Sequence, residues 1–244
     1  MYRLRFVVSL LVFNAAALPV AADPLTDLRA ILQRYPAKAR FAASASLRVD
    51  GQAEDAGSRA GSVHFDVVCD SGALSLRVPP SALQAATAEA QRKKHDADSS
   101  TPTRNAMVAM TIFDVVDALD MAAMLLNDLD GATLIKQSDT PGGRLLTIKV
   151  KPDLAGTRSR LVNEPVIELR VWLKSEGVPV AAERDSTYSA SVLFVKAANV
   201  RKERWEISVA GDRLYATRAD QSNRASAAGK ILASSRSATF VASR

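Results

Sequence analysis

The sequence has few of the residues that build disulfides or metal centres. Among 244 residues it has one cysteine, Cys69, and two histidines, His64 and His95. A single cysteine excludes an intrachain disulfide, so the fold depends on its hydrophobic core and its hydrogen bonds. Cys69 lies in the strand-like stretch HFDVVCDSG. We expect a buried, unreactive thiol there, because free cysteine packs as a small apolar residue.

Catalytic motifs are also missing. The sequence contains no HExxH, no CxxC, no phosphate-binding loop and no dinucleotide fingerprint. His64 and Asp66 share one face of a predicted strand, and without a nucleophile motif we interpret them as a surface pair rather than part of a catalytic triad. His95 lies in the polar run QRKKHDADSS. We therefore expect a protein that is not an enzyme and that needs no cofactor or metal.

Long hydrophobic runs are absent except at the start of the chain. Arg3 and Arg5 precede an apolar run over residues 6–17, and Val20-Ala21-Ala22 follows with small side chains. This order is typical of a secretory signal peptide, and the run is too short to cross a bilayer core of about 30 Å. We expect residues 1–22 to be a signal peptide cleaved after Ala22, which predicts a periplasmic protein.

The positive charge of the chain is concentrated in its second half. The formal net charge is +6; residues 23–140 hold 12 basic and 16 acidic side chains, and residues 141–244 hold 18 and 10. In an exported protein such a basic half favours phospholipid head groups, acidic glycans or acidic proteins over nucleic acid. Simple solubility is the alternative explanation. We expect no nucleic-acid partner and, at most, peripheral contact with a membrane.

Hydrophobic periodicity predicts one α+β domain over residues 23–244. DPLTDLRAILQRY has helical spacing, RFAASASLRVDG and SVHFDVVCDSGALSLRVPP alternate as strands, and ALQAATAEAQRKKH reads as a polar helix. Residues 96–103 have the composition of a flexible loop. Strand patterns then follow from ATLIKQ to DRLYATRA, with the basic stretch LAGTRSRLVNE as a long loop and FVAS as a last short strand. This order favours a curved antiparallel sheet (a half-barrel) with helices packed on its concave face.

These segments resemble a known family. The stretches DLRAILQRYPAKARFAASASLRV and GSVHFDVVCDSGALSLRVP, continued by LLTIKVKPD and VIELRVWLKSEGVPV, resemble the periplasmic lipoprotein-carrier superfamily, which includes LolA, LolB and RseB. The resemblance implies a half-barrel closed by helices around a cavity for a lipid acyl chain. The arginine- and tryptophan-rich sheet motif of LolA is replaced here by HFDVVCDSGALSLRVP, so no site residue is transferred by motif.

The segment Asn105–Gly131 collects four of the five methionines, five aspartates and no basic residue. Drawn as one helix at 100° per residue, it places an aliphatic stripe, from Val108 to Leu126, on the face buried against the sheet. The methionines then share the sector of the aspartates, away from that stripe. We therefore predict a lid or cavity lining formed by Met107, Met110, Phe113, Met121 and Met124.

Three explanations of the methionines remain open. They can fill an irregular packing gap, or form a recognition surface for variable apolar partners. The pairs Met107/Met110 and Met121/Met124 also suggest thioether ligands for Cu(I) or Ag(I). Separately, Trp205 with Arg201, Lys202 and Arg204 suggests a head-group or partner contact, with an ordinary sheet tryptophan as the alternative.

The first hypothesis is a non-enzymatic periplasmic carrier or sensor. It binds a lipid or lipoprotein acyl chain in an apolar cavity, with the methionine segment as lid. The alternatives are an adapter with a filled core that binds an envelope protein, and a methionine-based Cu(I)/Ag(I) binder. An apolar-lined empty volume between sheet and helices distinguishes the carrier from the adapter.

Overall fold

The computed structural model describes residues 23–53, 57–58, 60–70, 73–110, 112–152, 162–192 and 195–243. The predicted signal peptide and most of the predicted basic loop lie outside these residues. Five helices are described: α1 (Pro24–Leu32), α2 (Pro80–His95), α3 (Pro102–Ala109), α4 (Ile112–Leu119) and α5 (Met121–Asp128). The strands are β1 (Phe41–Ala53), β2 (Gly57–Ser58), β3 (Gly61–Asp70), β4 (Ala73–Arg77), β5 (Thr133–Thr140), β6 (Gly143–Lys149), β7 (Val162–Lys174), β8 (Pro179–Val192), β9 (Val195–Ala210), β10 (Arg213–Ala227) and β11 (Lys230–Ala242).

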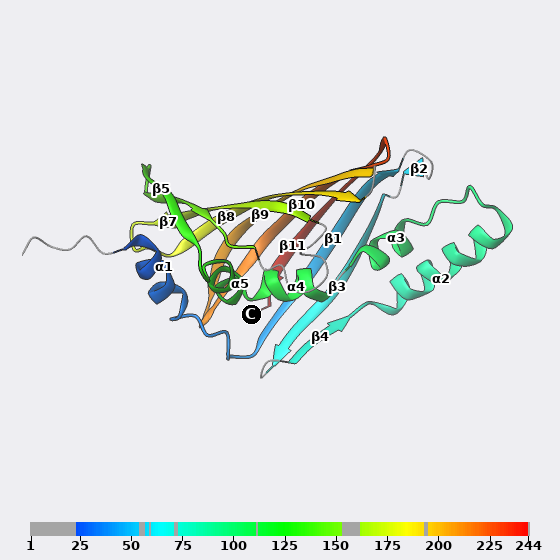
Figure 1. The fold of residues 1–244 in the computed structure, drawn as a ribbon. Helices are drawn as coiled ribbons and strands as arrows, with labels where there is room; N and C mark the ends of the chain where they lie inside the picture. The colour runs from blue at the N-terminus through cyan, green and yellow to red at the C-terminus, as the bar shows by residue number, and fades with distance from the viewer. Residues whose placement is uncertain are drawn as a thin grey trace, which may run out of the picture.

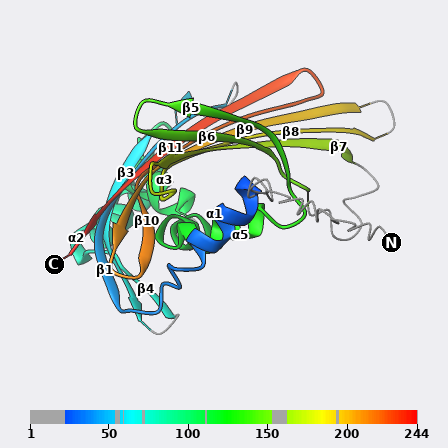
Figure 2. The same ribbon diagram turned by 90° about the vertical axis from the view of Figure 1, so that its left-hand side faces the viewer.

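The strands form one antiparallel sheet. Its order is β4-β3-β1-β11-β10-β9-β8-β7-β6-β5, and the short β2 pairs with β1 off this path. The first long strand therefore lies beside the last one, with Ala45 opposite Phe240. The sheet curves over α1, α4 and α5 (Figures 1 and 2). The predicted α+β class, with a curved antiparallel sheet and helices on its concave face, is confirmed.

Local sequence explains the first elements. The Asp23 carboxylate accepts a hydrogen bond from Leu25 N at 3.2 Å and caps α1. Leu25, Leu28 and Leu32 form its buried face. In β1 the apolar side chains at every second position are buried, namely those of Ala43, Ala45, Leu47 and Val49. The side chains between them point to the other face of the sheet, toward solvent.

Not every helix covers the sheet. α3 packs against β3 and β1, and α2 packs on α3. Figure 1 shows α2 extending beyond the edge of the sheet formed by β3 and β4. The Glu89 carboxylate of α2 accepts hydrogen bonds from Thr103 N at 3.1 Å and Arg104 N at 2.9 Å, which fixes the first turn of α3. No described helix is long and apolar enough to cross a bilayer.

The prediction of a single helix over Asn105–Gly131 is wrong. The chain breaks at Met110, which has extended backbone, and again at Asp120, giving α3, α4 and α5. The Asp120 side chain accepts from Ala123 N at 3.1 Å and starts α5 as a new helix. Each break rotates the following helix, so a continuous helical wheel assigns the wrong faces after Met110.

The last two strands are much longer than expected. A short FVAS strand was predicted, but β10 and β11 together run from Arg213 to Ala242 around a turn at Ala228 and Gly229, both with positive φ. Their distal halves are rich in serine, alanine and arginine, so hydrophobic alternation does not reveal them. Backbone hydrogen bonds hold these halves in the sheet: β11 pairs with β10 in the hairpin and with β1 on its other side.

The predicted flexible loop 96–103 is partly helical. α3 already begins at Pro102. Before it, the Asp96 carboxylate accepts hydrogen bonds from Asp98 N at 3.0 Å and Ser99 Oγ at 2.9 Å and forms a tight turn.

Candidate functional site

An apolar hollow lies between the concave face of the sheet and the junction of α3 with α4. Its volume is about 60 Å³. The sheet contributes apolar side chains from β1, β3, β9, β10 and β11: Leu47, Phe65, Trp205, Ala219, Ala238 and Phe240. The helical cover contributes Ala109, Met110 and Val115. Charged side chains line it as well: Asp117, Glu203, Asp220 and Arg236.

Strand register explains why there is space at this position. Leu47, Ala238, Ala219 and Trp205 lie side by side across β1, β11, β10 and β9. The two central positions carry alanine and the two outer positions carry large side chains. A row with small side chains between large ones leaves a depression in the sheet surface. The hollow is this depression in the sheet surface, and the helices cover it from the side opposite the sheet.

The next row of the concave face is polar. Moving two residues along each strand places Arg184, Glu203, Gln221 and Arg236 side by side across β8, β9, β10 and β11. The face therefore changes from apolar to polar within one step of the strand pleat. This boundary limits how far an apolar ligand extends along the sheet.

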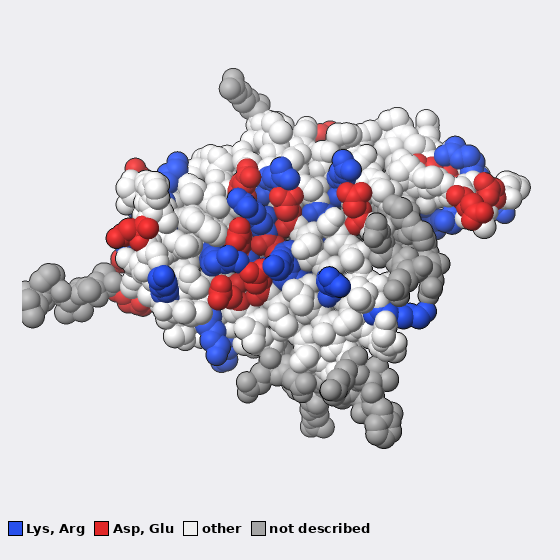
Figure 3. Space-filling view, turned by 90° about the horizontal axis from the view of Figure 1, so that it is seen from above, with Lys and Arg blue, Asp and Glu red and all other residues white. Residues whose placement is uncertain are grey.

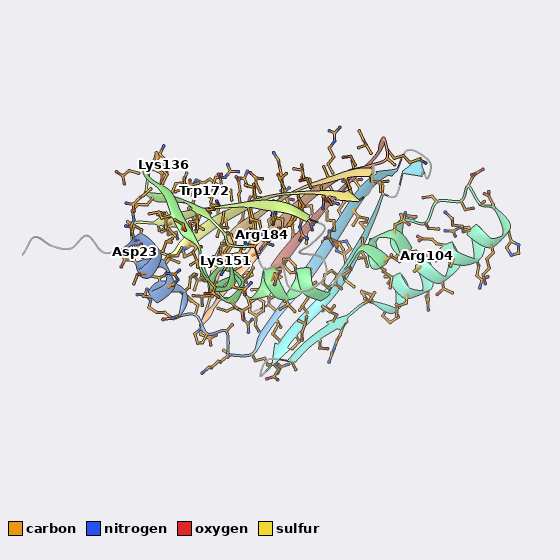
Figure 4. All side chains as sticks on the ribbon, in the orientation of Figure 1. Asp23, Arg104, Lys136, Lys151, Trp172 and Arg184 are labelled. Atoms are coloured by element: carbon orange, nitrogen blue, oxygen red, sulfur yellow. The ribbon has the colours of Figure 1, made fainter. Side chains whose placement is uncertain are left out.

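Arg184 is the centre of a buried charge network at this boundary. Figure 4 shows Arg184 between the sheet and α5. Its Nη1 lies 3.0 Å from Asp128 Oδ2 and its Nε lies 2.7 Å from Glu203 Oε2. Its guanidinium carbon lies 5.3 Å from the ring centroid of Trp205, a cation–π contact. The network ties α5 to the sheet beside the hollow.

The buried carboxylate and guanidinium influence each other's pKa. Burial raises the pKa of the Asp128 carboxyl, and the positive charge of Arg184 opposes that shift. Burial would lower the pKa of Arg184, but the Asp128 and Glu203 carboxylates outweigh it and raise the pKa. Arg184 is therefore charged at all physiological pH values.

Two other arginines hold the helical cover through backbone carbonyls. Arg236 Nη1 on β11 donates to Ala109 O at the end of α3, at 3.0 Å. The buried Arg213 on β10 donates to Leu119 O at the end of α4, at 3.0 Å, and to Ala37 O at 2.6 Å. The cover is thus attached to the sheet at both sides of the α3–α4 junction.

Only some of the residues predicted to form a lid or cavity lining lie at the hollow. Met110 lines the hollow, and Met107 is half-buried against the core. Met121 and Met124 lie in the core, with 0% and 6% of their surface exposed. Met124 does share a face with Asp128, since both contact Arg184. That face is buried, so the expectation that these methionines lie away from the core is wrong; α5 starts a new helical register at Asp120. The side chain of Phe113 lies outside the described residues.

The predicted aliphatic stripe holds only in part: Val115, Leu119 and Ala122 are buried as expected, and other members are not. Val108 is 76% exposed and Val116 is 44% exposed, although the continuous wheel placed both toward the sheet.

The surroundings of Met124 bear on the metal-binding hypothesis. Met124 Sδ lies 4.0 Å from the guanidinium of Arg184. A nearby positive charge opposes Cu(I) or Ag(I) binding at that sulfur. Among the described residues, no cluster of histidine, cysteine and carboxylate side chains is arranged to hold a metal.

The predicted head-group residues do not share one surface. Trp205 is buried beside the hollow, and Arg201, on the same face of β9, pairs with Glu203. Lys202 and Arg204 alternate to the convex face, where Arg204 Nη1 lies 3.6 Å from Glu183 Oε1. The four residues therefore cannot contact one head group together, because strand alternation separates them.

The convex face is covered by charges that pair with one another. Figure 3 shows acidic and basic side chains intermixed over the middle of this face. Arg170 Nη1 lies 3.3 Å from Glu183 Oε2, and Arg218 Nε lies 2.7 Å from Asp220 Oδ2. His64 and Asp66 also face solvent, and Asp66 accepts from Ser44 Oγ, so the predicted surface pair is confirmed.

Cys69 is half-buried on β3 rather than fully buried. It lies opposite Phe41 on β1 and Leu74 on β4. Burial raises the pKa of its thiol, Asp120 raises it further, and Arg213 opposes the shift. Less thiolate is present at neutral pH than for an exposed cysteine, which agrees with the expected low reactivity.

No protein-family model matches the sequence, and no curated protein matches it. Among solved structures, the chain is similar to a LolA superfamily protein from Nitrosomonas europaea, with 9% sequence identity and a TM-score of 0.27. The match covers 87% of this chain and 89% of that chain.

Proposed function

We propose that this protein is an exported, non-catalytic carrier or sensor that binds a lipid or lipoprotein acyl chain in the hollow. The observation that supports this function is the row in which Ala238 and Ala219 lie between Leu47 and Trp205. It leaves apolar space under a helical cover. Each methylene transferred from water into such a site contributes about 0.8 kcal/mol to binding.

The size of the hollow implies that its cover moves. A water needs about 10–15 Å³ of cavity, so 60 Å³ holds only a few waters. Sites for larger organic ligands have volumes of about 300–1,000 Å³. An acyl chain therefore enters by displacing part of the cover. Met110 is the natural element to move, because it lies where helical hydrogen bonding is interrupted and because methionine repacks around different apolar shapes.

Native mass spectrometry tests the carrier function. The protein is purified from its export compartment without detergent, and N-terminal sequencing of the same sample tests cleavage after Ala22. We expect a bound species of lipid mass. Met110→Asp places a charge in the hollow and is expected to abolish lipid retention. Val116→Asp, on the exposed side of α4 and away from the hollow, is the matched control and is expected to retain the lipid.

A second candidate, an adapter for an envelope protein, is favoured by the small volume of the hollow. A core that is nearly filled needs no ligand. This function predicts that the wild-type protein has a clean apo mass and that cross-linking in the envelope captures a protein partner. Lipid that remains bound to Met110→Asp would also count against the carrier, since the ligand would then lie elsewhere.

A further inference from the structure

A second, polar groove adjoins the hollow. It lies between α3, the end of α2 and the strands β1, β10 and β11, and its volume is about 640 Å³. Ala109, Gln221 and Arg236 line both the groove and the hollow. The two spaces therefore adjoin at the end of α3. A ligand with an apolar chain and a polar end fits both.

The charged side chains of the groove are mostly positive. Lys93, Arg104 and Arg236 line it, and Asp50 is the one carboxylate among its described lining residues. The Asp50 carboxylate lies 3.2 Å from Arg48 Nε and is already paired. Within the described part of the chain, Lys93 and Arg104 have no ion-pair partner. Lys93 and Arg104 thus present positive charge that is available to an anion.

The position of Arg104 is set by the fold. Glu89, itself buried, accepts hydrogen bonds from the backbone of Thr103 and Arg104 and holds the first turn of α3 against α2. The groove floor carries Asn223, whose Oδ1 atom is buried and has no hydrogen-bond partner among the described residues.

We propose that this groove binds the anionic head group of an amphiphile whose acyl chain occupies the hollow. The proposal rests on the carrier function and adds the chemical class of its ligand: a single- or multi-chain lipid with a phosphate or similar anion near the acyl ester. Lys93 and Arg104 supply the electrostatic attraction. Arg236 stands at the point where the head group meets the acyl chain.

Calorimetric titration with two lysolipids of the same acyl chain tests the proposal. Lysophosphatidylglycerol carries a net negative charge and lysophosphatidylcholine carries none; both are used below their micelle concentrations. We expect the variant Lys93→Gln/Arg104→Gln to bind lysophosphatidylglycerol about thirtyfold more weakly, at about a factor of five for each cation. Its affinity for lysophosphatidylcholine should fall much less, because the choline cation offsets the phosphate charge.

The control has the same change in net charge at a different place. Lys136→Gln/Lys151→Gln removes two exposed cations that lie near the opposite end of the molecule from Arg104 (Figure 4). It should leave both affinities unchanged. An equal loss in this control would overturn the local site, because net charge alone would then explain the effect.

The remaining outcomes separate the two proposals. If both lysolipids bind and the groove variant changes neither affinity, the carrier function stands and the head-group site is wrong. If neither lysolipid binds, both proposals fail. Glycerol 3-phosphate serves as a third ligand: if it alone competes at concentrations near the dissociation constant of lysophosphatidylglycerol, the groove is a site for soluble phosphates and not for an amphiphile.

Discussion

Filling the hollow gives the sharpest test of its physical nature. Ala238 lies in the centre of the row, between Leu47 and Ala219, and its side chain lines the hollow. Empty core volume costs about 24 cal/mol per Å³. A leucine at position 238 that fills all 60 Å³ would therefore stabilise the protein by at most about 1.4 kcal/mol. For a chain of this size that raises Tm by about 3–6 °C.

The control substitution is Ala216→Leu. Ala216 lies on the same strand as Ala219, is completely buried and does not line the hollow. A leucine there meets packed neighbours, and overpacking costs about 1–3 kcal/mol. The same substitution is thus expected to raise the free energy of unfolding at position 238 and to lower it at position 216, depending only on the space beside the alanine.

Urea unfolding measures both variants. Ala238→Leu should shift the midpoint to higher urea with an unchanged m-value, and Ala216→Leu should shift it to lower urea. Ala238→Leu should also lose bound lipid in native mass spectrometry. A loss of stability in Ala238→Leu equal to that in Ala216→Leu would refute the hollow. Higher stability with full lipid retention would keep the hollow and refute its role as the ligand site.

Three further predictions follow from the buried polar groups. Arg184→Met leaves two buried carboxylates without their shared cation and should lower the free energy of unfolding by about 3–5 kcal/mol, whereas Arg48→Met, in an exposed pair, should change it by less than about 1 kcal/mol in the same urea titration. Arg213→Met removes the donor to Leu119 O, and an unsatisfied buried acceptor costs about 1–3 kcal/mol; hydrogen exchange should show faster opening at the end of α4, and unchanged exchange there would contradict the anchoring role. Because burial raises the pKa of the Cys69 thiol, its alkylation rate should rise at higher pH than that of a cysteine peptide; coincident pH profiles would show a solvent-like thiol.

Elements with a strong local period were predictable from the sequence. In α1, the leucines at three- and four-residue spacing, the aspartate cap and the prolines at both ends are local signals, and together they predict the helix. In β1 and β3, side chains that alternate between apolar and polar identify the buried face. The α+β class and the curved sheet with helices on one face follow from the order of such elements.

The methionine segment shows where local periodicity misleads. Its apolar residues fit one long helix, yet the chain breaks at Met110 and Asp120. The resulting helices pack on different strands: α3 on β3 and β1, and α4 and α5 on β10. Asp120 followed by Ala123 offered a helix-cap signal, since aspartate readily accepts a backbone hydrogen bond at a helix start. The burial of Met121 and Met124 was not encoded in the continuous pattern.

The sequence by itself determined which residues of each strand share a face, because successive side chains of a strand point in opposite directions. It did not determine which residues lie side by side on neighbouring strands. Leu47, Ala238 and Ala219 are distant along the chain and meet only because β1 pairs with β11 and β11 with β10. The hollow and the polar row beside it depend on that strand order and register, which long-range backbone pairing sets and local sequence cannot.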